Sequence, residues 1–582
     1  MGPQTRAAEA THAMKYRQEN ETFRDAANRV AGTLKDSPEH YHQFRDILLD
    51  MRFSPAGRVQ SAIGAIRQTT PYNCYVSGTI ADSFIEGSDS IMERAKEAAA
   101  TMRLGGGIGY DFSTLRPRGA LIKKLQSHST GPMSFMNVFN EICKCVASSG
   151  HRRGAQMGVL RVDHPDILEF VNAKHNQDVL SGFNLSIGIT DEFMEAVARG
   201  SSFKLRFGGE TYREVDAGDL WETIMRSTWD WAEPGVLFID TINKMNNLQY
   251  CETIAATNPC GEQPLPPFGA CLLGSFNLVK YLHRQPVSVA DISAGIAGPG
   301  YSFDFAQLVE DIPAVVRAMD NVVDNAIYPL PQQEEEAKNK RRMGLGVMGL
   351  ANAAEAMGYP YGSEQFVAFE TKVLKLIANE SYRASALLAK EKGSFPLYSA
   401  EHYLKAPFIK TLDADVQFAI GKYGIRNSHL TSIAPTGTIS MCADNVSSSI
   451  EPVFSYTQRR PIQTPDGPLE MRLDDYGVRF LGVRGKRCDE VSVQEHVKVL
   501  VAAAKCVDSA VSKTCNMDGT VPWEDFKNLY KTAWEGGAKG CTTFNKDGKR
   551  FALLTSDDEV KPIEEAGEAC RIDLETGRRE CA

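Results

Sequence analysis

The sequence predicts an α/β protein in which helices alternate with short, mainly parallel strands. Residues 89–102 and 366–392 have the spacing of apolar positions that is typical of helices. Residues 184–189 and 429–433 are short runs rich in β-forming residues. Alternation of this kind favours a parallel sheet that is covered by helices.

The two ends of the chain differ from its middle. Residues 21–51 show helical spacing, so we expect a short helical N-terminal region over residues 1–52. The alternating pattern continues over residues 53–550, which we expect to form the main domain. Residues 551–582 become polar and acidic, and we expect a mobile tail there.

Composition narrows the class of protein. The 582 residues are 43% hydrophobic and 24% charged, which suits a globular protein, and the net charge is −9. A negative chain is poorly suited to binding a nucleic acid, whereas a small anionic ligand needs only a local basic cluster. Residues 1–19 lack the apolar core of a signal peptide, and no apolar run approaches the roughly 20 residues that span a bilayer. We therefore expect a cytoplasmic protein, in the host cytoplasm if it is viral, that binds neither nucleic acid nor membrane.

The thirteen cysteines indicate thiol chemistry rather than structural disulfides. In a long chain without a secretion signal, cysteines more often remain thiols, metal ligands or redox catalysts. No two cysteines are spaced as Cys-x-x-Cys, so we expect no zinc ribbon and assign no metal site. Most of them are expected to be small buried hydrophobic residues.

Three segments allow both a functional and a structural interpretation. Residues 344–349 (GLGVMG) fit the dinucleotide-binding pattern, but no apolar strand precedes them, so tight helix packing on small residues is favoured. Residues 104–109 (LGGGIG) either approach a phosphate or turn the chain at a helix end. Residues 332–342 (QQEEEAKNKRR) are predicted to form a solvated helix face with paired charges rather than a binding patch.

Residues 432–440 (SIAPTGTIS) join an apolar run to a turn rich in hydroxyl groups and then to a predicted helix start. Backbone N–H groups at a helix N-terminus, together with Thr and Ser hydroxyls, form an anion site. An ordinary capped helix explains the same pattern. The segment by itself leaves both interpretations open.

Residues 257–265 (TNPCGEQPL) carry the most distinctive chemistry. Two prolines exclude a helix or a central strand, so we predict an irregular loop. The loop presents the amide of Asn258, the thiol of Cys260 and the carboxylate of Glu262 within five residues, which is typical of a catalytic loop. The carboxylate suits a general base, and the thiol suits a nucleophile, a metal ligand or a hydrogen-atom carrier. The structural alternative is a loop around a buried cysteine.

The ordered motifs of the chain resemble those of the ribonucleotide reductase family from residue 53 to about residue 550. Each motif alone is weak, but the series is specific. The motifs are Ser54-Pro55, Asn73-Cys74, residues 105–109 with 115–119, 131–135, 152–155, Asn258-x-Cys260-x-Glu262, Cys271, 344–349 and 434–438. The resemblance implies a ten-stranded α/β barrel, made of two parallel five-stranded halves, with a finger loop that carries a radical cysteine through its centre.

The resemblance implies a role for each polar residue of the loop. Cys260 becomes a thiyl radical that removes the 3′ hydrogen of the ribose, Glu262 takes the proton of the 3′ hydroxyl, and Asn258 orients the ribose hydroxyls. Cys74 and Cys271 match the pair that protonates the departing 2′ hydroxyl and supplies two electrons by closing a disulfide. The implied reaction converts a ribonucleoside diphosphate or triphosphate to its deoxy form.

The resemblance also implies a substrate site. Ser54 and Asn73 match substrate-side positions. The phosphate cradle is matched by Ala434, Pro435, Thr436, Gly437, Thr438 and Ile439.

Regulation and recycling are implied as well. Asp82, Ser83 and Arg116 match positions that bind a deoxynucleotide or ATP effector across a homodimer interface, and residues 174–181 match the loop that relays its identity. A helix cap at 82–83 and a surface arginine are the structural alternative. Cys570 and Cys581 match the tail pair that reduces the active-site disulfide and is renewed by a thioredoxin- or glutaredoxin-type reductant, although their spacing is wider than usual. We expect no N-terminal ATP cone.

Family members differ in the source of the radical. Members that depend on a radical-generating subunit carry two adjacent tyrosines near the end of the barrel, where this chain has residues 540–545 (GCTTFN) and no Tyr-Tyr pair. The absence of this pair, together with the sequences of residues 258–262 (NPCGE) and 434–438 (APTGT), favours the adenosylcobalamin-dependent class. A catalytic chain activated by a ferritin-like subunit is the alternative, and a non-redox nucleotide-binding protein is the weaker one.

Overall fold

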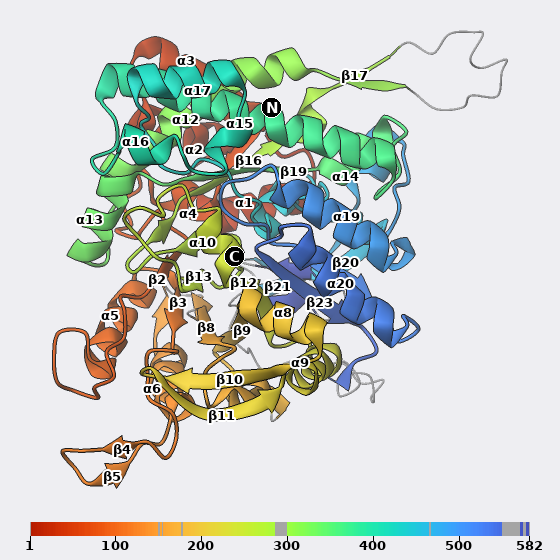
Figure 1. Cartoon of the computed structure of the whole chain (residues 1–582). Coiled ribbons are helices and arrows are strands. Elements are labelled where there is room, and N and C mark those ends of the chain that lie inside the picture. Colours follow the sequence, from red (N-terminus) through yellow and green to blue (C-terminus); the bar gives the residue numbers. More distant parts are fainter. Residues whose placement is uncertain are drawn as a thin grey trace. The chain divides into compact units, whose positions relative to one another are not determined.

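The structure is a computed structural model that describes residues 2–148, 152–153, 155–175, 179–285, 300–464, 467–549, 571–573 and 578–580. The chain forms two compact units, whose elements are labelled in Figure 1. Unit 1 consists of Met1–Tyr72, Leu272–Ile327 and Lys338–Ser509. Unit 2 consists of Asn73–Cys271, Tyr328–Ala337 and Ala510–Ala582. Both units are therefore assembled from segments that are distant in the sequence.

Unit 2 is built on a sheet with the strand order β15-β2-β3-β8-β9-β12-β23-β22. The strands from β2 to β12 run parallel to their neighbours. β15 and β23 pair antiparallel with β2 and β12, and β22 lies parallel to β23. The bounds are β2 Cys74–Val76, β3 Gly107–Asp111, β8 Gln156–Arg161, β9 Phe183–Ile189, β12 Gly235–Phe238, β15 Ala270–Cys271, β22 Thr514–Met517 and β23 Gly540–Asn545.

Amphipathic helices accompany the strands of unit 2. α5 begins after Ser90, whose hydroxyl accepts a hydrogen bond from the N–H of Glu93. One side of α5 buries Ala95, Ala98 and Met102. The helices are α5 Ile91–Arg103, α6 Pro132–Cys145, α7 Ile167–Val171, α8 Asp191–Arg199, α9 Ala217–Trp231, α10 Ile239–Lys244 and α20 Trp523–Glu535. Two-stranded pairs are β4 Leu121–Ile122 with β5 Ser127–His128, β6 Ala147–Ser148 with β7 Arg152–Arg153, β10 Ser202–Phe207 with β11 Glu210–Asp216, β13 Ala256–Thr257 with β14 Pro264–Leu265, and β24 Arg571–Asp573 with β25 Arg578–Glu580.

Unit 1 contains a three-stranded sheet with the order β1-β16-β19, in which β19 is parallel and β1 antiparallel to β16. Its strands are β1 Phe53–Pro55, β16 Leu273–Asn277 and β19 Gly344–Met348, and two further pairs are β17 Leu282–Arg284 with β18 Tyr301–Phe303 and β20 Thr457–Thr464 with β21 Gly467–Asp474. The long helices α12 and α15 pack against each other. The helices are α1 Arg6–Tyr16, α2 Phe23–Leu34, α3 Pro38–Leu49, α4 Gly57–Ala62, α12 Phe305–Asn325, α14 Leu350–Ala356, α15 Glu364–Lys392, α16 Ala400–Tyr403, α17 Ala414–Tyr423, α18 Gly437–Cys442 and α19 Val493–Ala504, while α13 Pro331–Lys340 runs from unit 2 into unit 1.

The N-terminal part of unit 1 contains the helices α1, α2 and α3. A capping box at Thr22 and Asp25 starts α2, and Ser37 followed by Pro38 starts α3. The three helices contribute buried apolar side chains to this unit, such as Val30 and Phe44.

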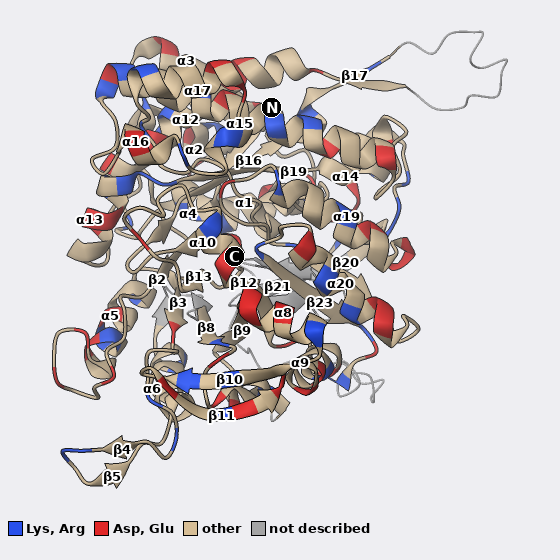
Figure 2. Ribbon diagram, in the orientation of Figure 1, with Lys and Arg blue, Asp and Glu red and all other residues tan. Residues whose placement is uncertain are grey.

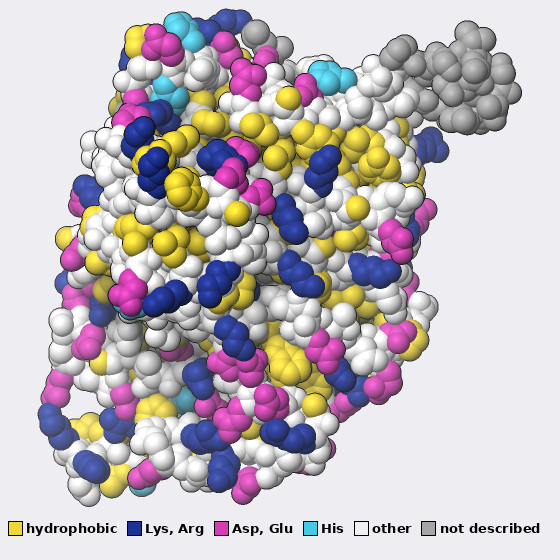
Figure 3. Space-filling view, turned by 45° about the horizontal axis from the view of Figure 1, so that its top comes forward, with side chains coloured by type: hydrophobic (Ala, Val, Ile, Leu, Met, Phe, Trp, Pro, Cys, Tyr) yellow, Lys and Arg dark blue, Asp and Glu magenta, His cyan; other side chains and the backbone are white. Residues whose placement is uncertain are grey.

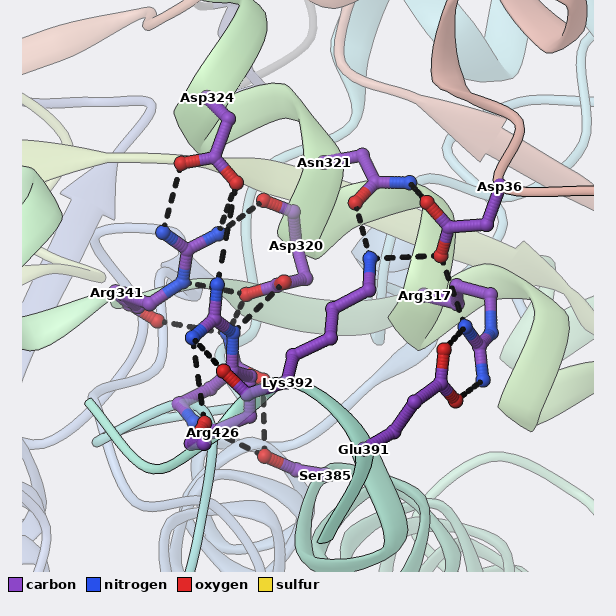
Figure 4. Close-up of polar contacts among 12 residues, drawn as sticks. Asp36, Arg317, Asp320, Asn321, Asp324, Arg341, Ser385, Glu391, Lys392 and Arg426 are labelled. Carbon is purple, nitrogen blue, oxygen red and sulfur yellow. Dashed lines mark hydrogen bonds and ion pairs between the residues drawn. The ribbon is translucent and has the colours of Figure 1, made fainter. Parts of the chain in front are cut away.

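The charged stretch 332–342 is helical as far as Lys340, but its end is not a solvated face. Arg341 is 4% exposed and forms ion pairs with Asp320 and Asp324, both at 2.8 Å (Figure 4). Oδ2 of Asp320 also accepts a hydrogen bond from Nε of Arg426 at 3.1 Å. The expected solvated face was wrong at this end because acidic side chains of α12, distant in the sequence, neutralise the arginine inside unit 1.

Several expectations for the fold are confirmed. The protein is mixed α/β with a large, mainly parallel sheet. Residues 184–189 and 366–392 lie in β9 and α15, and residues 91–102 of the predicted helix 89–102 lie in α5. Residues 429–433 are not a full strand, because they form isolated bridges at Thr431 and Ile433, of which the bridge at Thr431 is parallel to Leu345.

Charged side chains of both signs are spread over the described part of the protein. Lys, Arg, Asp and Glu are interspersed along the described ribbon and over the face drawn in Figure 3 (Figures 2 and 3). Among the described residues, no helix is long and apolar enough to cross a membrane.

Candidate active site

The loop at residues 258–263 is the tip of a hairpin between β13 and β14, which we call the finger hairpin (256–265). The N–H of Asn258 donates to the carbonyl of Gln263 at 3.1 Å, and Oδ1 of Asn258 accepts the N–H of Gln263 at 2.9 Å. The N–H of Gly261 donates to the carbonyl of Asn258 at 3.0 Å, and Gly261 has a φ of +82°. Asn258 thus closes the turn, and glycine supplies the left-handed conformation that it needs.

Two glycines of β3 make room for the finger hairpin. A Cβ added to Gly109 would lie 1.8 Å from the carbonyl oxygen of Thr257, and one added to Gly107 would lie 3.2 Å from Cγ of Pro259. Nδ2 of Asn184 on β9 also donates to the carbonyl of Pro259 at 3.1 Å. The glycine-rich stretch 104–109 therefore turns the chain after α5 and then admits the hairpin.

The polar side chains of the hairpin are buried. Asn258 is 0%, Cys260 1% and Glu262 2% exposed. Nδ2 of Asn258 is buried and has no hydrogen-bond partner among the described residues. Because such a group is costly to leave unsatisfied, it is suited to donate to a ligand. Cys260 is disulfide-bonded in this structure, so thiol chemistry at this residue requires its reduction.

Cys74 and Cys271 are brought together by the antiparallel pairing of β2 and β15, in which they are direct partners. Directly opposed residues have Cα atoms about 4.5–5.5 Å apart, which lies within the range of a disulfide. Burial, the hydrogen-bonded Cys74 thiol and the charge of Glu262 raise the pKa of Cys271 well above its ordinary value. Cys271 therefore stays protonated as a neutral thiol, and the charge of Glu262 contributes to this shift of its pKa.

Asn73 and Gln263 add polar groups to this site. The carbonyl of Asn73 accepts the N–H of Gly107 at 2.9 Å, while its buried Oδ1 has no partner among the described residues. Gln263 is 1% exposed, and its Nε2 likewise has no partner in the described part of the chain. Sequence reasoning missed Gln263, although its place directly after Glu262 in a predicted catalytic loop was a usable signal.

In unit 1, the segment of residues 432–440, which we call the cradle segment, turns sharply at Thr436, which has a φ of +57°. α18 begins at Gly437, and no described side chain caps it. Oγ1 of Thr436 instead accepts the N–H of Ser449 at 2.7 Å. The ordinary capped helix is thus not what the structure contains, and the first N–H groups of α18 remain suited to an anion. Ser54, also in unit 1, lies on β1 and is 8% exposed.

The motif at 344–349 supports the cradle segment. Residues 344–348 form the buried strand β19, so the expected helix packing was wrong and the glycines do not follow a strand as a dinucleotide motif requires. A Cβ on Gly346 would lie 2.3 Å from the carbonyl oxygen of Ser432. The N–H of Ser432 donates to the carbonyl of Leu345 at 3.0 Å. Glycine is needed here for close approach of two backbones.

Two of the three predicted effector residues contact each other in unit 2. Nε of Arg116 lies 2.7 Å from Oδ2 of Asp82, and Oγ of Ser83 accepts the N–H of Glu86 at 3.1 Å. The helix-cap alternative for 82–83 is wrong, because Ser90 caps α5.

Other predicted regulatory positions are only partly visible. In the segment 174–181, Lys174 forms an ion pair with Glu233 at 2.8 Å, and residues 176–178 lie outside the described residues. Cys570 and Cys581 also lie outside the described residues.

Comparison with known proteins adds an independent finding. The family described as the barrel domain of ribonucleotide reductase matches residues 73–469 and 484–544. The vitamin B12-dependent ribonucleoside-diphosphate reductase of Thermoplasma acidophilum is 32% identical over 552 residues, which cover 89% of this chain and 67% of that protein. The protein of the same name from Mycobacterium tuberculosis is 34% identical over 520 residues, which cover 84% of this chain and 70% of that protein. A vitamin B12-dependent ribonucleotide reductase of Streptomyces coelicolor is 26% identical over 633 residues, which cover 94% of this chain and 64% of that protein.

Proposed function

The chain belongs to the ribonucleotide reductase family, and we propose that it reduces ribonucleoside diphosphates by thiyl-radical chemistry with adenosylcobalamin. The observation that carries the proposal is the buried finger hairpin, whose Glu262 contributes to the raised pKa of Cys271, together with the direct strand pairing of Cys271 with Cys74. An acid–base group, a hydrogen-atom carrier and two reducing thiols are what the reaction requires.

The proposed reaction assigns each group one step. The Cys260 sulfur takes the hydrogen atom from the 3′ carbon, and Glu262 takes the proton of the 3′ hydroxyl. Nδ2 of Asn258 donates to a ribose oxygen, since its Oδ1 is already used by Gln263. Cys74 and Cys271 provide two protons and two electrons, so that the 2′ hydroxyl leaves as water, the 2′ carbon gains hydrogen and the sulfurs form a disulfide. At the end Glu262 returns its proton to the 3′ oxygen, and Cys260 returns the hydrogen atom to the 3′ carbon.

The site is compatible with a cobalamin. A Cβ on Gly261 would meet no described atom within 4 Å, which leaves space beside Cys260 for the reactive end of a cofactor. The residues that would contact that end are Pro259, Cys260 and Gly261. When bound, adenosylcobalamin supplies the acceptor for the hydrogen atom of the Cys260 thiol. β23, where subunit-dependent members carry two tyrosines, has Thr542, Thr543 and Phe544.

The proposal extends to fold and partners. It includes a closed ten-stranded barrel, which is supported by the five parallel strands from β2 to β12. Residues 1–52 are the N-terminal region, 53–550 the barrel domain and 551–582 the redox tail with Cys570 and Cys581. Ser54, Asn73 and residues 434–439 bind substrate. Asp82, Ser83 and Arg116 bind a dNTP or ATP effector in a cytoplasmic homodimer that a thioredoxin- or glutaredoxin-type protein reduces.

One assay tests the function. The purified chain is incubated with CDP, dithiothreitol and adenosylcobalamin, and dCDP is measured. Wild type and the exposed-cysteine control Cys145→Ser should form product, whereas Cys260→Ser should form none. Product that appears only after addition of a second protein would refute the cobalamin assignment. Full activity of Cys260→Ser would refute the radical assignment.

A further inference from the structure

A chain of hydrogen bonds links the N-terminal helix α1 to Ser54 within unit 1. Nε of Arg17 donates to Nδ1 of His12 at 3.1 Å, and Nε2 of His12 lies 3.0 Å from Oε1 of Gln60. Nε2 of Gln60 lies 3.1 Å from Oγ of Ser54 and 2.7 Å from the carbonyl oxygen of Pro55. The chain thus runs without a break from an arginine to a residue that we assign to the substrate site.

The direction of these hydrogen bonds is fixed from both ends. The guanidinium of Arg17 can only donate, so Nδ1 of His12 must accept and its proton lies on Nε2. That proton points to Oε1 of Gln60, which leaves the NH₂ group of Gln60 facing Ser54. At the other end, the carbonyl of Pro55 can only accept, so a nitrogen of Gln60 must face it. Both ends independently require the same orientation of the amide.

The consequence falls on the hydroxyl of Ser54. Its oxygen accepts a hydrogen bond from Gln60, so its own proton must be directed elsewhere. The contact from this hydroxyl to the carbonyl of Pro55 is 3.4 Å, well beyond the usual range of about 2.5–3.0 Å for such a bond. The same carbonyl already accepts from Gln60 at 2.7 Å. The proton of Ser54 is therefore available to a ligand.

The chain is held rigidly. Gln60 lies on α4, and the carbonyls of Gln60 and of Ile63, the residue that follows the helix, accept hydrogen bonds from Arg29 at 3.0 and 2.6 Å. Arg29 is itself paired with Glu21 at 2.7 Å. His12 is 4% exposed and Arg17 is held by a bidentate pair with Glu9. Side chains fixed in this way lose little further entropy when a ligand binds.

We infer that Gln60, held by His12 and Arg17, is a positioning residue that fixes the hydroxyl of Ser54 as a donor to a phosphate oxygen of the nucleotide. A phosphate oxygen only accepts, which matches a hydroxyl whose accepting side is already used. The inference rests on the proposed function, because it takes Ser54 as a substrate contact. It gives the N-terminal helix a part in substrate binding.

Binding of CDP to four variants tests the inference. Gln60→Glu still accepts from His12 but cannot donate to Ser54, and Gln60→Met removes the donor without adding charge. Ser54→Ala and both Gln60 variants should weaken CDP binding about 10- to 100-fold, as expected for a lost hydrogen bond to a charged group. They should raise KM far more than they lower kcat. The double variant Ser54→Ala/Gln60→Met should bind no more weakly than Ser54→Ala alone, because Gln60 acts through Ser54.

The outcomes distinguish a failure of the Ser54 substrate contact from a failure of the role of Gln60. Unchanged CDP binding by Ser54→Ala would show that Ser54 is not a substrate contact and would remove that part of the proposed function. A weakened Ser54→Ala beside unaffected Gln60 variants, or fully additive effects in the double variant, would overturn only the role of Gln60. Thermal unfolding of each variant is measured alongside.

His12 provides a second route if the Gln60 variants do not fold. His12→Gln keeps a donor toward Gln60 and an acceptor toward Arg17, whereas His12→Leu keeps neither. In His12→Leu only the carbonyl of Pro55 still orients the amide of Gln60, so His12→Gln should bind CDP about two- to tenfold more tightly than His12→Leu. Equal affinity of the two variants would overturn the part that the inference assigns to His12 and Arg17.

Discussion

Replacing His12 by Gln should make the stability of the protein less sensitive to acid. Burial of the imidazole, reinforced by the charge of Arg17, lowers the pKa of His12 from 6.5 to about 4, against the weaker opposing influence of Gln60, Glu9 and Glu21. In the unfolded chain the imidazole titrates near its ordinary pKa. Between pH 6.5 and 4 the unfolded chain therefore takes up a proton that the folded protein refuses.

The sign and size of the effect follow from this difference. Above pH 6.5 the imidazole is neutral in both states and contributes no pH dependence. As the pH falls toward 4, protonation favours the unfolded state, and the free energy of unfolding decreases. A fall of the pKa from 6.5 to about 4 corresponds to about 3 kcal/mol, since each tenfold change in an equilibrium constant is worth about 1.4 kcal/mol.

The assay compares wild type with His12→Gln in urea unfolding, followed by circular dichroism between pH 7.5 and 4. Burial also lowers the pKa of His40 and of His164, but these contributions are common to both proteins and cancel in the difference. The stability of His12→Gln relative to wild type should rise by about 3 kcal/mol over this range. Two curves that stay parallel from pH 7.5 to 4 would refute the assigned protonation of His12.

Three further predictions address the rest of the molecule. Gly109→Ala should lower kcat about 100-fold, because its Cβ must displace the carbonyl of Thr257 and misplace the finger hairpin; unchanged kcat would contradict the packing. Alkylation of Cys271 by iodoacetamide at pH 8, read by mass spectrometry, should be at least about tenfold slower than that of the exposed Cys145, and equal rates would contradict the raised pKa and burial. Arg341→Leu should lower the free energy of unfolding by about 1.5–3 kcal/mol in urea melts, since the buried carboxylate of Asp320 loses the closer of its two arginine partners and keeps only Arg426, and a loss under about 0.5 kcal/mol would contradict this.

Local patterns predicted local structure well. The apolar spacing of residues 89–102 and 366–392 corresponds to α5 and α15, and the helical spacing of residues 21–51 corresponds to α2 and α3. These features depend on neighbours in the sequence. Helix formation and capping are decided within a few residues, so the sequence carries the information directly.

Features that depend on distant partners were not predictable. The charges of residues 332–342 looked solvated because the acidic partners of Arg341 lie on α12. The glycines at 344–349 suggested helix packing because nothing local indicates that Ser432 approaches Gly346. The pairing of Cys74 with Cys271 depends on the sheet register, and only the family resemblance suggested it.

The candidate site shows the same division. The loop at Asn258, Cys260 and Glu262 was recognisable because its polar groups are adjacent in the sequence. The chain from Arg17 through His12 to Gln60 joins segments that have no shared motif, so no local pattern pointed to it. Hydrogen-bond direction becomes visible only once all partners are known.

Gly109 and Gly346 have the same consequence for anyone who redesigns this protein. Each lies in a strand of a different unit, and each leaves room for one backbone carbonyl, that of Thr257 or of Ser432. Any side chain at either position would push back the finger hairpin or the cradle segment through its backbone. A library that varies the loops but leaves Gly109 and Gly346 unchanged therefore keeps the distance between each segment and the strand beneath it. A single methyl group at either glycine increases that distance.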